Sequence, residues 1–180
     1  MILCLGLSLR QASFNVRLAR AAATLVREAG AGAEPVALRD LGIPPYDADV
    51  EATLGIPAPV HDLAERVRSA RGVIIAFPEY NRAMAGVAKN AIDWLSRVRP
   101  YVFEGKPALL LSASSGRGAG AAALATSRPI LEHVDAVVYA ETFGLARAKE
   151  AFDEAGVIAD PETAVRLRAV IAGWLASLPS

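Results

Sequence analysis

The sequence predicts an α/β protein built on a parallel β-sheet, and three observations support this. Short, almost wholly apolar runs recur five times along the chain, each long enough for one buried strand. Stretches with apolar residues three and four positions apart lie between most of them, as crossover helices require. Polar or glycine-rich loops follow three of the runs. At 180 residues, the chain is expected to form a single domain over 1–180.

The first half of the chain is predicted to contain two strands, two helices and a long connection. In order, they are a strand over 2–5, a helix over 15–29, a strand over 35–38, a loop over 39–59 and a helix over 60–71. Ser13 is the expected N-cap of the first helix, because a serine hydroxyl accepts from the free N–H groups of a first turn. The proline-containing connection is long enough to lie across a site.

The second half begins with the apolar, β-branched run expected to be the central strand. The predicted elements are a strand over 73–77, a helix over 85–97, a strand over 107–111, a helix over 121–133, a strand over 136–143, a polar irregular segment over 144–159 and a helix over 161–178. Pro129 lies inside the predicted helix over 121–133, so we expect a kink or a break there.

Strands that alternate with crossovers in this way most simply form a flavodoxin-like, three-layer α/β fold with a five-stranded parallel sheet in the order 2-1-3-4-5. In that order, the loops after strands 1, 3 and 4 share the carboxyl edge of the sheet. Open α/β sheets bind their ligands at this edge. We therefore expect these three loops to form one binding crevice.

The composition excludes several classes of partner. Lys plus Arg and Asp plus Glu each total 19, so no net charge attracts nucleic acid or an anionic membrane. The N-terminal apolar run has no basic flank and is too short for a membrane span, so a cytoplasmic location is expected. Cys4 is the only cysteine, which leaves no disulfide within the chain and favours a core role for its thiol.

The loop after the first strand carries the polar side chains Ser8, Arg10, Ser13 and Asn15 immediately before a helix. Free N–H groups and the positive end of the helix dipole would lie beside them, which suits a phosphate monoester. An ordinary capped turn explains the same residues.

Two further loops complete the expected crevice. Pro78 cannot donate to a sheet, so Glu79, Tyr80 and Asn81 are expected to leave the central strand as a polar loop. After the fourth strand, a loop over 112–120 that includes Ser114, Ser115 and Gly116 is rich in serine and glycine, which allows its backbone to approach a ligand closely.

The glycine-rich loop also formally fits the dinucleotide pattern G-x-G-x-x-G/A at Gly116, Gly118 and Ala121, with Glu141 as the acidic residue. That fingerprint belongs to the first strand-helix turn of its fold, so we interpret the loop only as a glycine-lined ligand loop.

Several catalytic arrangements lack their usual residues. Ser8 and Ser115 are candidate nucleophiles of a hydrolase, but Gly6 to Arg10 lacks the second glycine of G-x-S-x-G, and no motif links a histidine to an acid. No phosphate-binding G-x-x-x-x-G-K-[ST], zinc-ligand cluster or magnesium-type carboxylate set is present, so no metal is expected. An organic cofactor would then supply the reactive group.

Four motifs together resemble the NADPH-dependent FMN reductase family, and within it the bacterial quinone and chromate reductases. They are Ser8-Leu9-Arg10-x-x-Ser13-x-Asn15, Tyr46-Asp47-Ala48-Asp49-Val50, Pro78-Glu79-Tyr80-Asn81, and Lys89-Asn90-Ala91-Ile92-Asp93-Trp94-Leu95-Ser96-Arg97. The resemblance runs from the first strand to about Gly120. The third and fourth motifs are the most specific.

The resemblance implies that FMN occupies the crevice. The first motif would surround its phosphate, Pro78 to Asn81 would follow its ring, and Ser114, Ser115 and Gly116 would lie beside the ring or ribityl chain. The implied reaction takes a hydride from NADPH or NADH and passes electrons to quinone-like, azo, nitro or metal-oxyanion acceptors such as chromate. Arg117 is either a ligand for the extra phosphate of NADPH or a solvated arginine.

Members of the family are usually dimers or tetramers, so a homodimer or homotetramer is implied, with Trp94, Tyr101 and Phe103 as contact residues or as ordinary core. The chain departs from the family at Leu7, where the family has glycine; this side chain is expected to narrow the phosphate loop. Ala85 replaces a proline. The alternative function is a flavodoxin-like binding or regulatory module.

Overall fold

The computed structural model describes residues 1–153 and 156–179, so Glu154, Ala155 and Ser180 of the predicted segments lie outside the described residues. The elements are β1 (Ile2–Gly6), α1 (Phe14–Glu28), β2 (Ala33–Ala37), η1 (Leu38–Asp40), α2 (Ala48–Leu54), α3 (Ala58–Ser69), β3 (Gly72–Ala76), β4 (Glu79–Tyr80), β5 (Ala83–Met84), α4 (Gly86–Leu95), β6 (Pro107–Ala113), α5 (Ala121–His133), β7 (Val137–Val138), β8 (Phe143–Leu145), α6 (Ala148–Ala151) and α7 (Pro161–Ala176).

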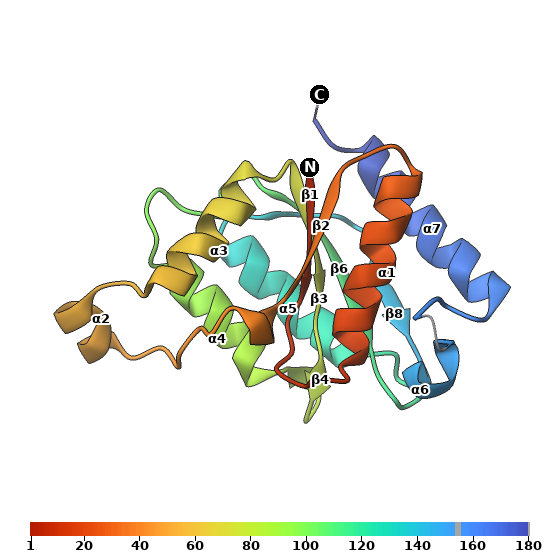
Figure 1. Cartoon of the computed structure of the whole chain (residues 1–180), viewed down its shortest axis with the longest axis horizontal. Coiled ribbons are helices and arrows are strands. Elements are labelled where there is room, and N and C mark those ends of the chain that lie inside the picture. Colours follow the sequence, from red (N-terminus) through yellow and green to blue (C-terminus); the bar gives the residue numbers. More distant parts are fainter. Residues whose placement is uncertain (154–155, 180) are drawn as a thin grey trace.

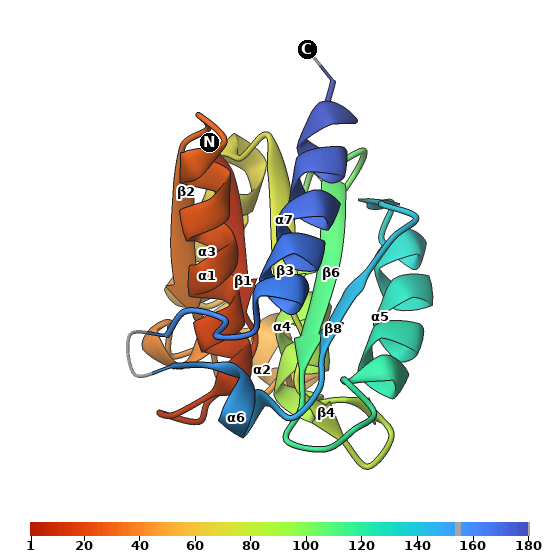
Figure 2. The same ribbon diagram turned by 90° about the vertical axis from the view of Figure 1, so that its right-hand side faces the viewer.

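The predicted sheet order is confirmed. The strands run β2-β1-β3-β6, and both β7 and β8 pair with the far side of β6, all of them parallel. Helices α1 and α7 cover one face and α3, α4 and α5 the other, which gives three layers (Figures 1 and 2). None of the helices in the described part of the chain is both long and apolar enough to cross a membrane.

The core alternates along each strand between these two faces. In β1, Leu3 and Leu5 pack on the side of α3 and α4, whereas Ile2 and Cys4 pack on the side of α1 and α7. Burial raises the pKa of the Cys4 thiol to about 12, so it stays protonated and unreactive at neutral pH. This confirms the core role predicted for it.

The fifth strand is not the continuous segment over 136–143 that we predicted. β7 pairs with Pro107 and Ala108 at the start of β6, and β8 pairs with 111–113 at its end. In the gap between them, the Arg128 guanidinium donates to the carbonyls of Tyr139 (2.7 Å) and Ala140 (3.0 Å). A side chain of α5 therefore satisfies backbone oxygens that a continuous strand would pair with its neighbour.

Pro129 does not break α5, which runs unbroken from Ala121 to His133. The missing proline N–H leaves the Ala125 carbonyl without its helical donor. Both residues lie on the exposed side of α5, where water can hydrogen bond to that carbonyl. The predicted break was therefore wrong because the lost bond lies outside the core.

The connection over 39–59 is also more ordered than predicted, since it contains η1 and α2. Asp47 caps α2 by accepting from the N–H groups of Asp49 (2.8 Å) and Val50 (3.3 Å). No residue of α2 is buried, and this short helix projects from the body of the protein at the left of Figure 1.

Candidate functional site

The carboxyl ends of β1, β3, β6 and β8 lie at one edge of the sheet. The loop after β1, the β4–β5 hairpin, the loop over 114–120 and α6 gather there, at the lower end of the molecule in Figure 2. The structure therefore brings the three predicted ligand loops to the same edge, together with a fourth segment, α6, that was not predicted to lie there.

The loop after β1 is held by its own serines. Ser13 is the N-cap of α1, and its hydroxyl accepts from the Val16 N–H at 3.4 Å, as predicted. The hydroxyl of Ser8 accepts from the Arg10 N–H at 3.3 Å, and the Ser8 side chain is buried. Arg10 itself is exposed. Each serine therefore shapes the turn into α1.

The start of α1 has the chemical features that a phosphate group requires. Within the described residues, the backbone N–H groups of residues 11–15 donate to no protein acceptor. Phe14 and Asn15 supply such donors in the first turn of the 15-residue helix, at its positive end, and the preceding loop supplies the others together with the Arg10 guanidinium. These residues fit the phosphate of FMN.

Leu7 does not line this loop, contrary to our expectation. Its side chain is 3% exposed and packs in the core on the side of α3 and α4. Its N–H donates to the Ala76 carbonyl at 3.0 Å, which extends the pairing of β1 with β3 by one residue. The side chain consequently follows the strand alternation and turns away from the predicted phosphate position.

Asn15 joins two of the loops. Its side-chain amide donates to the Ala113 carbonyl and accepts from the Ala113 N–H, both at 2.9 Å, and the residue is 4% exposed. The amide thus pairs with the end of β6 as a neighbouring strand would. The second N–H of the Asn15 side-chain amide is not used in this pairing. The role that the structure shows for Asn15 is to fix the loop after β1 to β6.

The predicted polar loop after Pro78 is a β-hairpin instead. Glu79 and Tyr80 of β4 pair with Met84 and Ala83 of β5. Asn81 and Arg82 at its tip adopt left-handed φ values of 52° and 63°. Two consecutive positive φ values are typical of a tight type I′ turn, for which asparagine is a common residue and arginine is not. Tyr80 and Asn81 are exposed.

Glu79 faces the protein rather than solvent, because it caps another helix. One of its carboxylate oxygens accepts from the N–H groups of Ala122 (3.0 Å) and Ala123 (3.3 Å) at the start of α5. The N-cap of α5 is Gly120, which has no side chain that could accept these bonds. The hairpin therefore supplies the cap and holds the glycine-rich loop in place.

Gly120 has no side chain because there is no space for one. A Cβ built there would lie 1.8 Å from Oγ and 2.5 Å from Cβ of Ser112, and its φ is +73°. The buried Ser112 hydroxyl donates to the Phe77 carbonyl at 2.6 Å, at the end of β3. We predicted a loop at both residues but missed this packing, since nothing local in the sequence indicates it.

The loop after β6 has a fixed base and an exposed tip. The Ser114 N–H donates to the Leu145 carbonyl at 3.0 Å, and its hydroxyl donates to the Gly116 carbonyl at 3.3 Å. Ser115 and Gly116 are exposed. The Arg147 N–H donates to the Gly116 carbonyl at 2.9 Å, so α6 begins beside this tip.

Two of the four resemblance motifs, the one around Tyr46 and the one around Asn90, bind one another. Asn90 accepts from the Tyr46 N–H at 2.7 Å and donates to the Pro44 carbonyl at 2.9 Å. Arg97 bonds Glu51, which lowers the pKa of that carboxyl, and the hydrogen bond to Glu51 raises the pKa of the Tyr46 phenol. This network anchors the connection over 39–59 on α4, so it does not lie free across a site.

Trp94 belongs to the same network. Its indole N–H donates to the Pro44 carbonyl at 2.9 Å. Its ring packs edge-to-face against the Tyr46 ring, with 4.9 Å between the ring centroids. Trp94 and Phe103 are core residues, 0% and 2% exposed, whereas Tyr101 is 44% exposed. Of the three aromatic residues considered for a subunit contact, only Tyr101 is available on the surface of the described chain.

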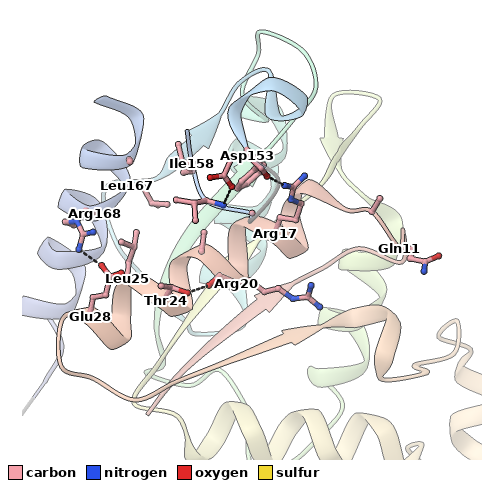
Figure 3. A pocket seen from close by; sticks show the side chains of 16 residues that line it. Gln11, Arg17, Arg20, Thr24, Leu25, Glu28, Asp153, Ile158, Leu167 and Arg168 are labelled. Carbon is pink, nitrogen blue, oxygen red and sulfur yellow. Dashed lines mark hydrogen bonds and ion pairs between the residues drawn. The ribbon is translucent and has the colours of Figure 1, made fainter. Parts of the chain in front are cut away.

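A cavity of about 880 Å³ in the described part of the chain does not lie between the loops. It lies between α1, α7 and residues 152–153 and 156–158, and touches the site only at Gln11 and Ala12 (Figure 3). Arg17 borders it and donates to the Asp153 carbonyl at 2.7 Å. We locate the site from the motif residues and their contacts, because this cavity contains none of the predicted ligands.

Comparison with known proteins identifies the family of the chain. The NADPH-dependent FMN reductase family matches residues 1–150. The chain is 47% identical over 132 residues to the quinone reductase of Escherichia coli K12 (73% of this chain, 69% of the relative). It is 40% identical over 155 residues to an NAD(P)H-dependent FMN reductase of Pseudomonas aeruginosa (85% and 81%).

A solved structure is similar over almost the whole chain. The flavoenzyme NAD(P)H:(acceptor) oxidoreductase FerB of Paracoccus denitrificans has a TM-score of 0.82 and 29% identity, covering 97% of this chain and 94% of that one. The sheet order and the loops at its carboxyl edge thus define a flavodoxin-like oxidoreductase fold. The chain belongs to the NADPH-dependent FMN reductase family, whose reaction uses FMN and a nicotinamide nucleotide.

Proposed function

We propose that this protein is an FMN-dependent NAD(P)H oxidoreductase that reduces quinone-like acceptors, with azo compounds, nitro compounds and chromate as further candidates. The observation that carries the proposal is the junction of three loops at one sheet edge, fixed by Asn15 to β6 and by Glu79 to α5. Quinone reductases among the relatives support the choice of acceptor.

Different loops would hold the two ends of FMN, its phosphate and its ring. The free N–H groups over 11–15, with Ser8, Arg10, Ser13 and Asn15, would hold the phosphate. Pro78, Glu79, Tyr80 and Asn81 would line the ring from the hairpin, and Ser114, Ser115 and Gly116 from the loop after β6. When bound, FMN accepts a hydride from the nicotinamide and delivers electrons to the acceptor.

The role of these protein groups is to bind and orient. Buried Asn15 and half-buried Glu79 fix the backbone of the loops, so little rearrangement is needed when a ligand enters. The Tyr80 side chain is 47% exposed on the hairpin, so its ring is accessible to a planar second substrate.

A visible absorption spectrum tests the proposal. Purified protein supplied with FMN and then freed of unbound flavin should keep the flavin bands, because the loop after β1 holds the phosphate. The bands should bleach on anaerobic addition of NADPH or NADH and return on addition of benzoquinone. Azo, nitro and chromate compounds then rank the acceptors by turnover. Retained flavin that neither nucleotide bleaches would point instead to a binding or regulatory module.

We also propose a homodimer or homotetramer formed by the 180-residue domain. The support is α2, which projects from the body and exposes Val50 at 39% and Leu54 at 80%. Leu54→Glu should therefore shift the sedimentation of the protein toward the monomer, with FMN binding retained. Ala52→Glu, which adds the same charge at another exposed position of this helix, serves as the control. A wild-type protein that sediments as a monomer at micromolar concentration would contradict the assembly.

A cytoplasmic location is proposed because the expected reductants, NADPH and NADH, are cytoplasmic metabolites. Fractionation of cells that express the tagged protein tests this location, and recovery outside the cytoplasmic fraction would contradict it.

A further inference from the structure

Two exposed arginines on neighbouring backbone segments lie at the rim of the candidate site. Arg117 lies at the tip of the loop after β6, and Arg147 is the N-cap of α6, directly after β8. The hydrogen bond from the Arg147 N–H to the Gly116 carbonyl joins the two backbones at 2.9 Å. Both side chains are exposed. Two arginines that are 30 positions apart in the sequence therefore have neighbouring backbones at the loop that contains Ser115 and Gly116.

This pair has no counter-charge in the described chain. Within residues 1–153 and 156–179, no carboxylate oxygen lies within 4.0 Å of either guanidinium. Lys149 and Glu150 follow on α6, and their opposite charges offset one another. Two exposed arginines on adjacent backbones, with no carboxylate partner, can both reach one anion.

Arg147 also has an unfavourable backbone conformation. Its φ of 46° and ψ of 44° are left-handed, a region that glycine and asparagine adopt readily and arginine does not. Strain of this kind at the edge of a candidate site is a sign of function, since a glycine would remove it. An arginine therefore occupies a left-handed position whose backbone N–H bonds to the residue before Arg117.

We propose that Arg117 and Arg147 together bind the 2′-phosphate of NADPH and give the enzyme its preference for NADPH over NADH. This rests on the proposed function. The 2′-phosphate is the one group that NADPH has and NADH lacks, and as a monoester dianion it matches two guanidinium groups. Arg117 directly follows Gly116, the last residue of this loop that is proposed to line the flavin, so the pair lies at the border of the flavin site, where the adenosine end of the nucleotide would pass.

The test combines kinetics with direct binding to the FMN-loaded protein. Arg147→Gly removes the side chain and relieves the left-handed strain, so it should fold at least as well as the wild type. Arg147→Gly and Arg117→Ala should each raise the KM for NADPH about tenfold and change the KM for NADH less than twofold. In calorimetry, adenosine 2′,5′-bisphosphate should bind about tenfold more weakly to each variant, and 5′-AMP should bind unchanged. Arg20→Ala, an exposed arginine on α1, is the control.

Three results would overturn the inference. Equal rises in KM for both nucleotides would assign the arginines to the shared pyrophosphate, and a rise only in the KM of a charged acceptor would assign them to the second substrate. A wild-type enzyme with equal KM values for NADPH and NADH would also contradict the inference, because the two arginines would then confer no preference. The flavin spectrum of each variant is recorded separately, so loss of FMN, which would count against the proposed function, is told apart from loss of nucleotide selectivity.

Discussion

Gly120→Ala is expected to destabilise the protein by about 3 kcal/mol or more, which lowers Tm by about 10 °C. The new Cβ would overlap Ser112 Oγ at 1.8 Å and Ser112 Cβ at 2.5 Å. Rotating the serine hydroxyl would break its bond to the Phe77 carbonyl and still leave the contact with Cβ, so the backbone of α5 or β6 must move. Thermal and urea unfolding measure the loss.

Gly118→Ala is the matched control for this prediction, because it adds the same methyl group two residues earlier in the same loop. No heavy atom lies within 4 Å of a Cβ built at Gly118. Its effect should stay within about 0.5 kcal/mol. Equal effects of the two substitutions would show that the tight packing of Gly120 against Ser112 is not what requires a glycine. Gly120→Ala should also weaken FMN binding, since Glu79 links α5 to the hairpin.

Asn15→Ala is expected to cost about 2–4 kcal/mol of stability and to weaken FMN binding. It leaves the N–H and carbonyl of Ala113 without the amide that bonds both, at a buried position where each unpaired group is costly. The loop after β1 would also lose its attachment to β6, so the donors over 11–15 would no longer be held in place. Urea unfolding and an FMN titration give the two effects separately.

Asn15→Asp refines this prediction. The carboxylate can still accept from the Ala113 N–H, but it has no N–H to donate to the Ala113 carbonyl. It also adds a negative charge beside the proposed phosphate position. FMN should therefore bind more weakly to Asn15→Asp than to Asn15→Ala. Gln11→Ala removes an exposed amide from the same loop and should change neither property. Wild-type FMN affinity in Asn15→Ala would refute the positioning role.

The features predicted correctly from the sequence are those set by nearby residues. The strand over 73–77 and the Ser13 cap depend on apolar runs and on a serine next to a first turn, and both are found at those places. The sheet order followed from general rules of connection. The family resemblance was confirmed by comparison with known proteins.

The missed features depend on residues that are distant in the chain. The two hydrogen bonds between Asn15 and Ala113 were not predicted, because these residues lie 98 positions apart. The hairpin was missed because Arg82 carries no turn signal, although the structure places it in a left-handed conformation. Arg147 was missed because the fifth strand was expected to end at Phe143, before the segment that reaches the rim.

The split of the fifth strand into β7 and β8 has a consequence for the protein at high concentration. A long, flat edge strand is a template on which another chain can add a strand and begin to aggregate. Here that edge is interrupted over 139–142, where Arg128 already occupies two of the carbonyls. At the opposite edge, Pro35 in the middle of β2 has no N–H to offer. Both edges of the sheet therefore resist pairing with another chain, and this protection does not depend on a helix that covers them.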